Sequence, residues 1–273
     1  MNVHTERQVS ELRRITKDSD AREVALAAYA RLAVLLERLE PSDWDQSTEC
    51  DGWDVAAMVG HVIGAGEAGA SLTQNLRQLW YGKRNAARFG GNALDATNDL
   101  QVRQHAGLRP RERIAALREV APAAVDGRLG LPRALRRVSV PLDAGGSTAI
   151  GMPTRLRLGQ LMDVVYTRDV WLHTVDIARA TSASYEPDPR VDGRIVEDVV
   201  AEWAGRHAEP FALVLEGPAG GRFRQGTGGV SLHLDAIEFC RILSGRAEPP
   251  VDGAGSGGDG SAAARLLTTR LVF

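Results

Sequence analysis

The sequence predicts an α+β protein in which a helical bundle precedes a smaller domain of mixed helices and strands. Apolar residues recur three and four positions apart through most of residues 22–183, the spacing of helices that face a core. Beyond residue 188, short apolar segments are separated by glycine and proline, a pattern typical of strands. A chain of 273 residues can form two domains of ordinary size. We therefore expect one domain over residues 22–183 and a second over residues 188–273.

Composition narrows the class of partner. The 33 basic and 35 acidic residues give a net charge of −2, so we expect neither nucleic acid nor an anionic membrane as a partner. Two cysteines are too few for a disulfide framework, and the first residues lack the apolar core of a signal peptide. No uncharged apolar run approaches the ~20 residues of a membrane span. These features predict a cytoplasmic protein with a small-molecule site.

The predicted elements of the first domain are all helical. Residues 1–21 are polar and aperiodic, so we expect a loose arm there. Residues 126–154 interleave glycine, proline and arginine, which indicates a long irregular connection of a kind that is often functional or poorly ordered. Helices are expected over residues 22–39, 55–70, 72–83, 92–104, 112–125 and 158–181.

The second domain is expected to mix helices with antiparallel strands. A helix is predicted over Val191–Ala204, and Asp235 with Glu238 resembles a capping box that opens a helix ending at Gly245. Residues 252–261 are typical of a flexible linker, and we expect residues 266–273 to pack back on this domain. The expected strands are Phe211–Glu216, Gly221–Gln225 and Gly229–Leu234.

The helix that begins at Leu158 carries the strongest chemical signal. Asp169, His173 and Asp176 fall on its apolar stripe, where an ionisable side chain is costly without a partner. Asp169 and His173 are four residues apart, so both project from one side of one turn. They could be two ligands of a metal ion, or a buried Asp–His pair that only orders the helix. The apolar residues that define the stripe are Leu158, Met162, Val165 and Leu172.

A second histidine lies on the predicted helix over residues 55–70. His61 is flanked by Gly60 and Gly64, and glycine within a helix costs about 1 kcal/mol relative to alanine, which indicates close approach of another group. A satisfied core histidine is the alternative reading. In a bundle, His61, Asp169 and His173 would face one another, and two imidazoles with one carboxylate are a common set for catalytic zinc. Asp176 would then hold a ring N–H of a ligand.

These residues lie in segments that resemble a known family. ECDGWDVAAMVGHV (Glu49–Val62), DVWLHTVDIA (Asp169–Ala178) and Leu243-Ser244-Gly245-Arg246 are similar, in that order, to motifs of the DinB-like, mycothiol-dependent maleylpyruvate isomerase family. The resemblance extends from about Arg22 to Phe273. It implies a DinB-like four-helix bundle and a smaller, sterol-carrier-like α/β domain at the C-terminus. It also implies metal ligands at His61, Asp169 and His173; the family acid is commonly glutamate, so the shorter aspartate would narrow the site or change the metal held.

The resemblance further implies an activity. A divalent ion, with zinc as the expected metal, would bind mycothiol and favour its thiolate, which then attacks an electrophilic small molecule. The outcome would be cis–trans isomerisation or S-transfer by a monomer or homodimer. The family suggests a basic residue of the second domain at the substrate, for which Arg241 and Arg246 are candidates. Either arginine could instead cap its helix end.

Other readings remain open from sequence. The metal could serve a thiol-independent hydrolase or a tailoring enzyme of secondary metabolism, which turnover without added thiol would reveal. The chain could also be a non-catalytic ligand-binding module, which would retain metal and show no turnover. Cys50, just before the His61 helix, could be a nucleophile, but the resemblance implies that it packs beside Trp53.

Overall fold

The computed structural model describes residues 5–142, 152–250 and 260–273, and it divides into two compact units. The helical unit comprises residues 16–148 and 154–185. The sheet unit comprises residues 1–15, 149–153 and 186–273, so it takes in the N-terminal segment as well as the C-terminal half. Among the described residues, no helix has the length and apolar character needed to cross a membrane.

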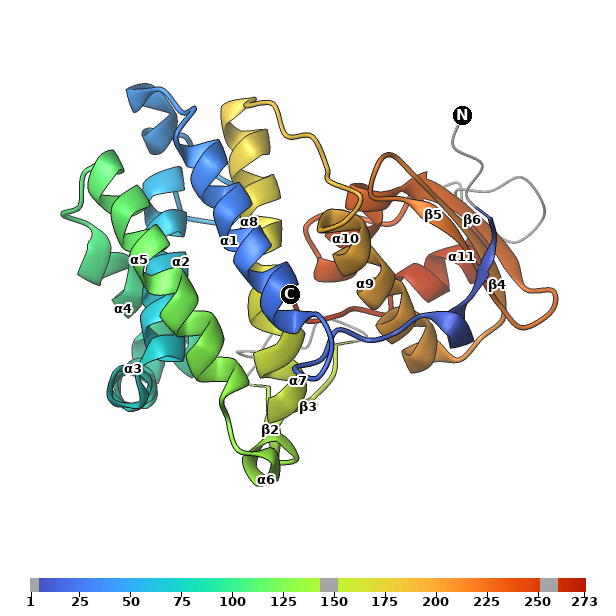
Figure 1. Cartoon of the computed structure of the whole chain (residues 1–273), viewed down its shortest axis with the longest axis horizontal. Coiled ribbons are helices and arrows are strands. Elements are labelled where there is room, and N and C mark those ends of the chain that lie inside the picture. The colour runs from blue at the N-terminus through green and yellow to red at the C-terminus, as the bar shows by residue number, and fades with distance from the viewer. Residues whose placement is uncertain (1–4, 143–151, 251–259) are drawn as a thin grey trace. The chain divides into compact units, whose positions relative to one another are not determined.

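The helical unit is a bundle built around α2. This helix packs against α4 and α5, while α1 packs against α5 and α8 (Figure 1). Leu32, Met58, Leu117 and Leu172, one from each of four helices, are fully buried at its centre. The periodicity of the sequence therefore predicted these elements correctly. Their bounds are α1 Ala21–Leu36, α2 Val55–Ala70, α3 Leu72–Asn85, α4 Ala93–His105, α5 Pro110–Leu129 and α8 Tyr166–Thr181.

The long helix expected from Leu158 is not regular throughout. It begins as α7 (Leu158–Gln160), continues as a π-helical segment over Leu161–Val165, and becomes regular only in α8. Because a π turn contains more residues than an α turn, the apolar stripe changes direction here. Val165 and Leu172 are buried as predicted, whereas Leu158 and Met162 are only half-buried.

The connection over residues 126–154 contains more structure than predicted. Helix α5 continues to Leu129, a short helix α6 covers Arg133–Arg136, and β2 (Ser139–Pro141) pairs antiparallel with β3 (Arg155–Arg157). An ion pair between Arg136 and the buried Asp163 ties α6 to the π-helical segment. This long-range contact could not be predicted from local pattern. Residues 143–151 of the connection lie outside the described residues.

The sheet unit is a four-stranded mixed sheet in the order β1-β5-β4-β6, with helices packed on one face. The rings of Trp203, Phe211 and Phe239 form its aromatic core, with Trp203 4.7 Å from Phe211 and 5.3 Å from Phe239 between ring centroids. Its elements are β1 Arg7–Gln8, α9 Asp192–His207, β4 Phe211–Glu216, β5 Gly221–Gln225, β6 Val230–Asp235, α10 Ala236–Ser244 and α11 Gly260–Leu267.

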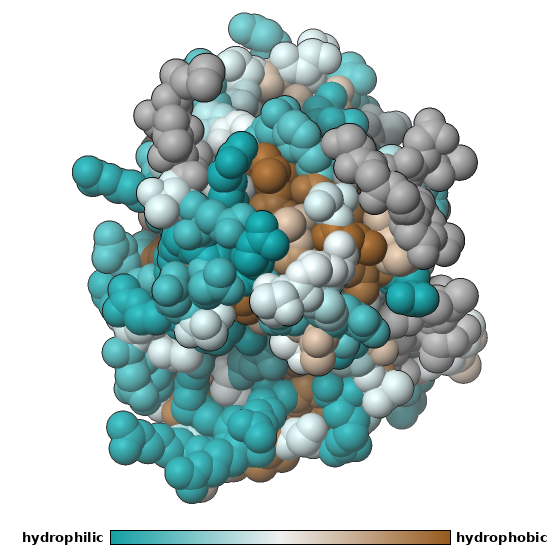
Figure 2. Space-filling model, turned by 90° about the vertical axis from the view of Figure 1, so that its right-hand side faces the viewer, coloured by the Kyte–Doolittle hydropathy of each residue, from teal (hydrophilic) through white to brown (hydrophobic). Residues whose placement is uncertain are grey.

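The other face of the sheet is not uniformly polar. Figure 2, turned by 90° from Figure 1, shows apolar side chains gathered near the centre of the view among hydrophilic ones. Along β4, Phe211, Leu213 and Leu215 are buried, while Ala212 and Val214 alternate with them and are half-buried. Residues of β4 thus contribute apolar side chains to both faces.

The prediction that all three strands are antiparallel is wrong for β6. β5 is antiparallel to β4, but β6 runs parallel to β4 along its other edge. The loop that joins β5 to β6 must pass around the start of β4. There Gly229 has a φ of 81°, and a Cβ at this position would lie 1.9 Å from the Pro210 carbonyl oxygen. Only glycine combines this conformation with such close approach. The glycine-rich loop therefore lets β6 pair parallel with β4, where antiparallel strands were expected.

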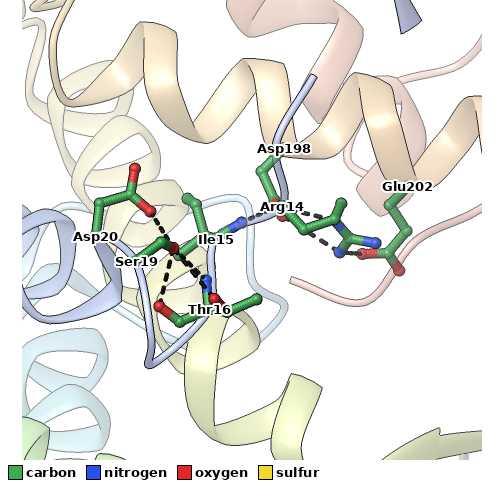
Figure 3. A network of polar contacts seen from close by, with 7 residues as sticks. All are labelled: Arg14, Ile15, Thr16, Ser19, Asp20, Asp198 and Glu202. Atoms are coloured by element: carbon green, nitrogen blue, oxygen red, sulfur yellow. Dashed lines mark hydrogen bonds and ion pairs between the residues drawn. The ribbon is translucent and has the colours of Figure 1, made fainter. Parts of the chain in front are cut away.

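Residues 5–15, which belong to the loose arm predicted over residues 1–21, are held in place by pairing and ion pairs. β1 pairs parallel with β5, and Arg14 binds two acidic residues of α9, Asp198 at 2.8 Å from Nε and Glu202 at 2.8 Å from Nη2 (Figure 3). The backbone N–H of Ile15 also donates to Asp198, over 2.6 Å. Because both acids are buried, their charges require such partners. They hold residues 5–15 against the sheet unit.

The end of the chain packs on α9 and α10, as predicted. The indole of Trp203 donates to the Leu266 carbonyl over 3.0 Å, and the Leu271 N–H donates to the Leu243 carbonyl over 3.0 Å. Asp235 caps α10, but Glu238 pairs with Arg241 and does not complete the expected capping box. Of the predicted linker, residues 252–259 lie outside the described residues, and Gly260 begins α11.

Candidate metal centre

The environment of His61 depends on how closely α4 approaches α2. A Cβ at Gly64 would lie 2.6 Å from Cβ of Gln101, so only glycine at this position allows the contact. The expected close approach to this face is thereby explained. It brings Gln101 Oε1 within 2.8 Å of His61 Nδ1. Both side chains are buried.

A chain of buried amides fixes the tautomer of His61. The Gly64 carbonyl can only accept, so Gln78 donates to it through Nε2 over 2.9 Å. Gln78 Oε1 then accepts from Gln101 Nε2 over 2.7 Å, which leaves Gln101 Oε1 as an acceptor for His61. His61 Nδ1 must therefore carry the proton. Its Nε2 is left with a free lone pair.

The helix α8 supplies the other two predicted ligands and fixes the second tautomer in the same way. His173 Nδ1 lies 3.1 Å from Oδ2 of Asp176, a fully buried carboxylate that accepts from the ring N–H. His173 Nε2 then faces Asp169 Oδ1 at 3.3 Å, and His61 Nε2 faces Asp169 Oδ2 at 3.5 Å. Asp176 thus lies behind the ring of His173, and a role for it beside a metal ligand stays a prediction.

Three acceptors that converge in this way require a cation between them. The lone pairs of two imidazoles and a carboxylate repel one another unless a metal ion or a proton intervenes. The separations of 3.3 and 3.5 Å match the edge of about 3.3 Å in a tetrahedron whose bonds are about 2.0–2.1 Å long. The described residues therefore fit a divalent ion, and all three ligand atoms lie within 4.8 Å of one another.

A proton held between His173 and Asp169 can also fill this role. Burial by itself would lower the pKa of His173, but the Asp169 carboxylate beside it raises that pKa well above the usual range. Burial would likewise raise the pKa of Asp169, yet the charge of His173 and the hydrogen bond from its ring hold that pKa well below its usual range. The two shifts together favour an imidazolium at His173 beside a carboxylate at Asp169.

Trp53 and Cys50 border the site. The Trp53 ring centroid lies 4.9 Å from that of His61 and 6.3 Å from that of His173. The Cys50 sulfur lies within 4.8 Å of a possible ligand atom of His173 and of one of Asp176. Cys50 is therefore a neighbour of the site as well as of Trp53. Its position just before α2 was the only sequence signal for this.

Arg241 and Arg246 belong to the sheet unit. Arg241 is buried at the end of α10, where it donates to Glu238 over 2.6 Å and to the Arg246 carbonyl over 3.4 Å. These contacts fit the helix-end alternative for Arg241. Contact of either arginine with substrate stays a prediction.

Comparison with known proteins places the chain in a family. The family model for the mycothiol maleylpyruvate isomerase N-terminal domain matches residues 25–178, which is more than half of the chain. Positions 61, 169 and 173 lie within this range. The chain belongs to this family. Two solved structures share the fold of this chain. One is a mycothiol-dependent maleylpyruvate isomerase, with a TM-score of 0.51, and the other is a histidine-to-alanine mutant of that enzyme, with a TM-score of 0.50. Each is 15% identical over 85% of this chain and 92% of its own. Among curated proteins, none matches the sequence significantly.

Proposed function

We propose that this chain is a metal-dependent enzyme that activates mycothiol for attack on an electrophilic small molecule, as a maleylpyruvate-type isomerase or an S-transferase. The observation that carries the proposal is the convergence of His61 Nε2, His173 Nε2 and the Asp169 carboxylate. Each histidine uses its Nδ1 for a hydrogen bond within the protein, so its Nε2 faces the proposed metal position. Membership of the mycothiol maleylpyruvate isomerase family supports the choice of thiol.

The residues divide the work between binding and orientation. His61, Asp169 and His173 would hold the ion, and this mixed set with an open fourth position suits zinc. When bound, a divalent ion supplies positive charge that favours the deprotonated form of a coordinated thiol, as it does for bound water. Gln101 and Asp176 keep the two imidazoles in the ligating tautomer.

The proposed chemistry balances without any other reagent. The mycothiol thiolate adds to a cis double bond conjugated to a carbonyl, and the π electron pair moves to the carbonyl oxygen as an enolate. After rotation about the new single bond, the electron pair returns and expels the thiolate, which leaves the trans isomer. With an electrophile that carries a leaving group, the same attack gives a thioether and the departing anion.

Replacing His173 by alanine tests this proposal. We expect the variant to lose bound metal and mycothiol-dependent isomerisation of maleylpyruvate together. The substitution removes one of the two imidazoles that face Asp169, and so one of the three proposed metal ligands. The control is His233→Ala, which removes an exposed histidine of the sheet unit that pairs with Glu216. Wild-type turnover without any thiol, or full activity in His173→Ala, would contradict the proposal.

A further inference from the structure

Two buried arginines on α5 differ in how many hydrogen-bond acceptors surround their guanidinium groups. Arg113 and Arg128 are each 4% exposed. All three nitrogens of the Arg113 guanidinium donate to backbone carbonyls: Nε to Leu108 at 3.0 Å, Nη1 to Ala56 at 2.9 Å and Nη2 to Ala106 at 3.3 Å. Arg113 therefore has a complete structural explanation.

The guanidinium of Arg128 does not have such a full set of acceptors. Its Nη2 donates to Thr167 Oγ1 over 2.8 Å, but Nε and Nη1 are enclosed and have no acceptor within the described part of the chain. Nor does any carboxylate of the described residues form an ion pair with it. A buried guanidinium with unused donors is costly, because it has given up hydration without replacing it. Such a group is found where an anion is to be bound.

Arg128 belongs to the same region as the candidate metal centre. Thr167, its one partner, precedes Asp169 by two residues on α8. The charge of Asp169 acts on Arg128, and Tyr29 and Tyr166 interact electrostatically with the same guanidinium. Asp163, the other acid that acts on Arg128, is already paired with Arg136.

The two tyrosines add hydrogen-bond donors beside this positive charge. Neither the Tyr29 nor the Tyr166 hydroxyl has a hydrogen-bond partner among the described residues, and neither hydroxyl oxygen is fully enclosed. Both hydroxyls therefore retain accessible surface in an otherwise buried region. Burial raises the pKa of Tyr29 to about 12, so this hydroxyl keeps its proton and remains a donor at neutral pH.

We propose that Arg128, Tyr29 and Tyr166 form an anion subsite that receives a carboxylate of the electrophilic substrate. That the ligand is the electrophile rests on the proposed function; the existence of an anion site does not. The subsite would select unsaturated acids over neutral analogues. It would also hold the acid so that its double bond meets a thiol at the centre formed by His61, Asp169 and His173.

The test measures binding without thiol or turnover. Calorimetric titration of the purified protein with maleate, the simplest cis-unsaturated diacid, should give saturable binding that its neutral diamide does not show. Arg128→Met should weaken maleate binding at least tenfold, and Tyr29→Phe should weaken it about tenfold, because each removes a hydrogen bond to a charged group. Arg113→Met is the matched control, a buried guanidinium on the same helix, and should leave the affinity unchanged.

The His173→Ala variant distinguishes binding at this subsite from binding to a metal ion. Maleate binding should persist in His173→Ala, since it does not depend on a metal ligand. Failure of wild type to bind maleate at millimolar concentration, or unchanged affinity in folded Arg128→Met and Tyr29→Phe, would overturn the proposal. So would binding that is lost in His173→Ala but kept in Arg128→Met. If maleate binds as expected but no thiol supports turnover, only the proposed function fails.

Discussion

Each candidate histidine ligand uses Nδ1 for a hydrogen bond within the protein and turns Nε2 toward Asp169. For His173 the partner is a carboxylate three residues along the same helix, and for His61 it is an amide forty residues away on α4. The first partner can be predicted from spacing, because residues three apart on a helix are neighbours. The second cannot, because nothing in the local pattern indicates that Gln101 faces α2.

Replacing Gln101 by leucine tests whether this amide holds the metal ligand in place. We expect metal affinity to fall by about tenfold to a hundredfold, the usual effect of losing a partner behind a ligating histidine. The measurement is competition for zinc against a chelator of known affinity. Gln104→Leu, on the same helix but exposed, is the control and should keep wild-type affinity. Equal affinity in both variants would show that Gln101 does not orient His61.

At the scale of elements, small residues set the distances between helices. Gln101 reaches His61 only because α2 has glycine at position 64, where a Cβ would come within 3.1 Å of even the Gln101 Cα. Gly205 on α9 provides the contrast, since a Cβ there would meet nothing within 4 Å. Two glycines in helices thus have different reasons to be present.

Alanine at these two positions should have opposite effects. Gly64→Ala should destabilise the protein by about 1–3 kcal/mol, the usual cost of overpacking, and should lower metal affinity as α4 moves away. Gly205→Ala should stabilise it by up to ~1 kcal/mol through helix propensity alone. Urea denaturation of both variants checks the signs. A stabilising Gly64→Ala would mean that the α2–α4 contact is less close than the structure indicates.

Element boundaries were largely predictable, but element partners were not. α2 and β4 have the bounds expected from periodicity, because periodicity is local. The direction of β6 was predicted wrongly, because it depends on how the Gly226–Gly229 loop passes around Pro210. Helix α3 buries Gln78 and Gly82 and exposes its large apolar residues, so periodicity alone would misplace its inner face. The exposed residues are Leu72, Leu76, Leu79 and Trp80.

At the scale of the whole molecule, stability should depend on pH through the sheet unit. His207 stacks on Trp203 and Phe211, and its Nδ1 accepts from the Glu209 N–H over 2.9 Å. Its Nε2 is enclosed and has no hydrogen-bond partner among the described residues. Burial lowers the pKa of His207 to about 4, whereas an unfolded histidine titrates near the ordinary value of 6.5. The unfolded state therefore binds more protons as the pH falls from about 6.5 toward 4.

The neutral imidazole of His207 thus contributes stability that is present above pH ~6.5 and is lost as the pH falls toward 4. Between pH 7.5 and 5.0, wild type should lose about 1–2 kcal/mol more than His207→Phe, after allowance for partial exposure of the ring. Urea denaturation at the two pH values gives this difference. Parallel losses in the two proteins would show that His207 titrates normally in the folded state.

The central claim is that His61, Asp169 and His173 form a metal centre, and metal content tests it most directly. Wild type and Asp169→Ala, both purified without a histidine tag, should be compared by plasma mass spectrometry, with circular dichroism to confirm equal helix content. We predict about one zinc per wild-type chain and none in the variant, because two imidazoles alone leave the site without its carboxylate. A folded wild type without divalent metal, or a variant that keeps its full complement, would contradict the account.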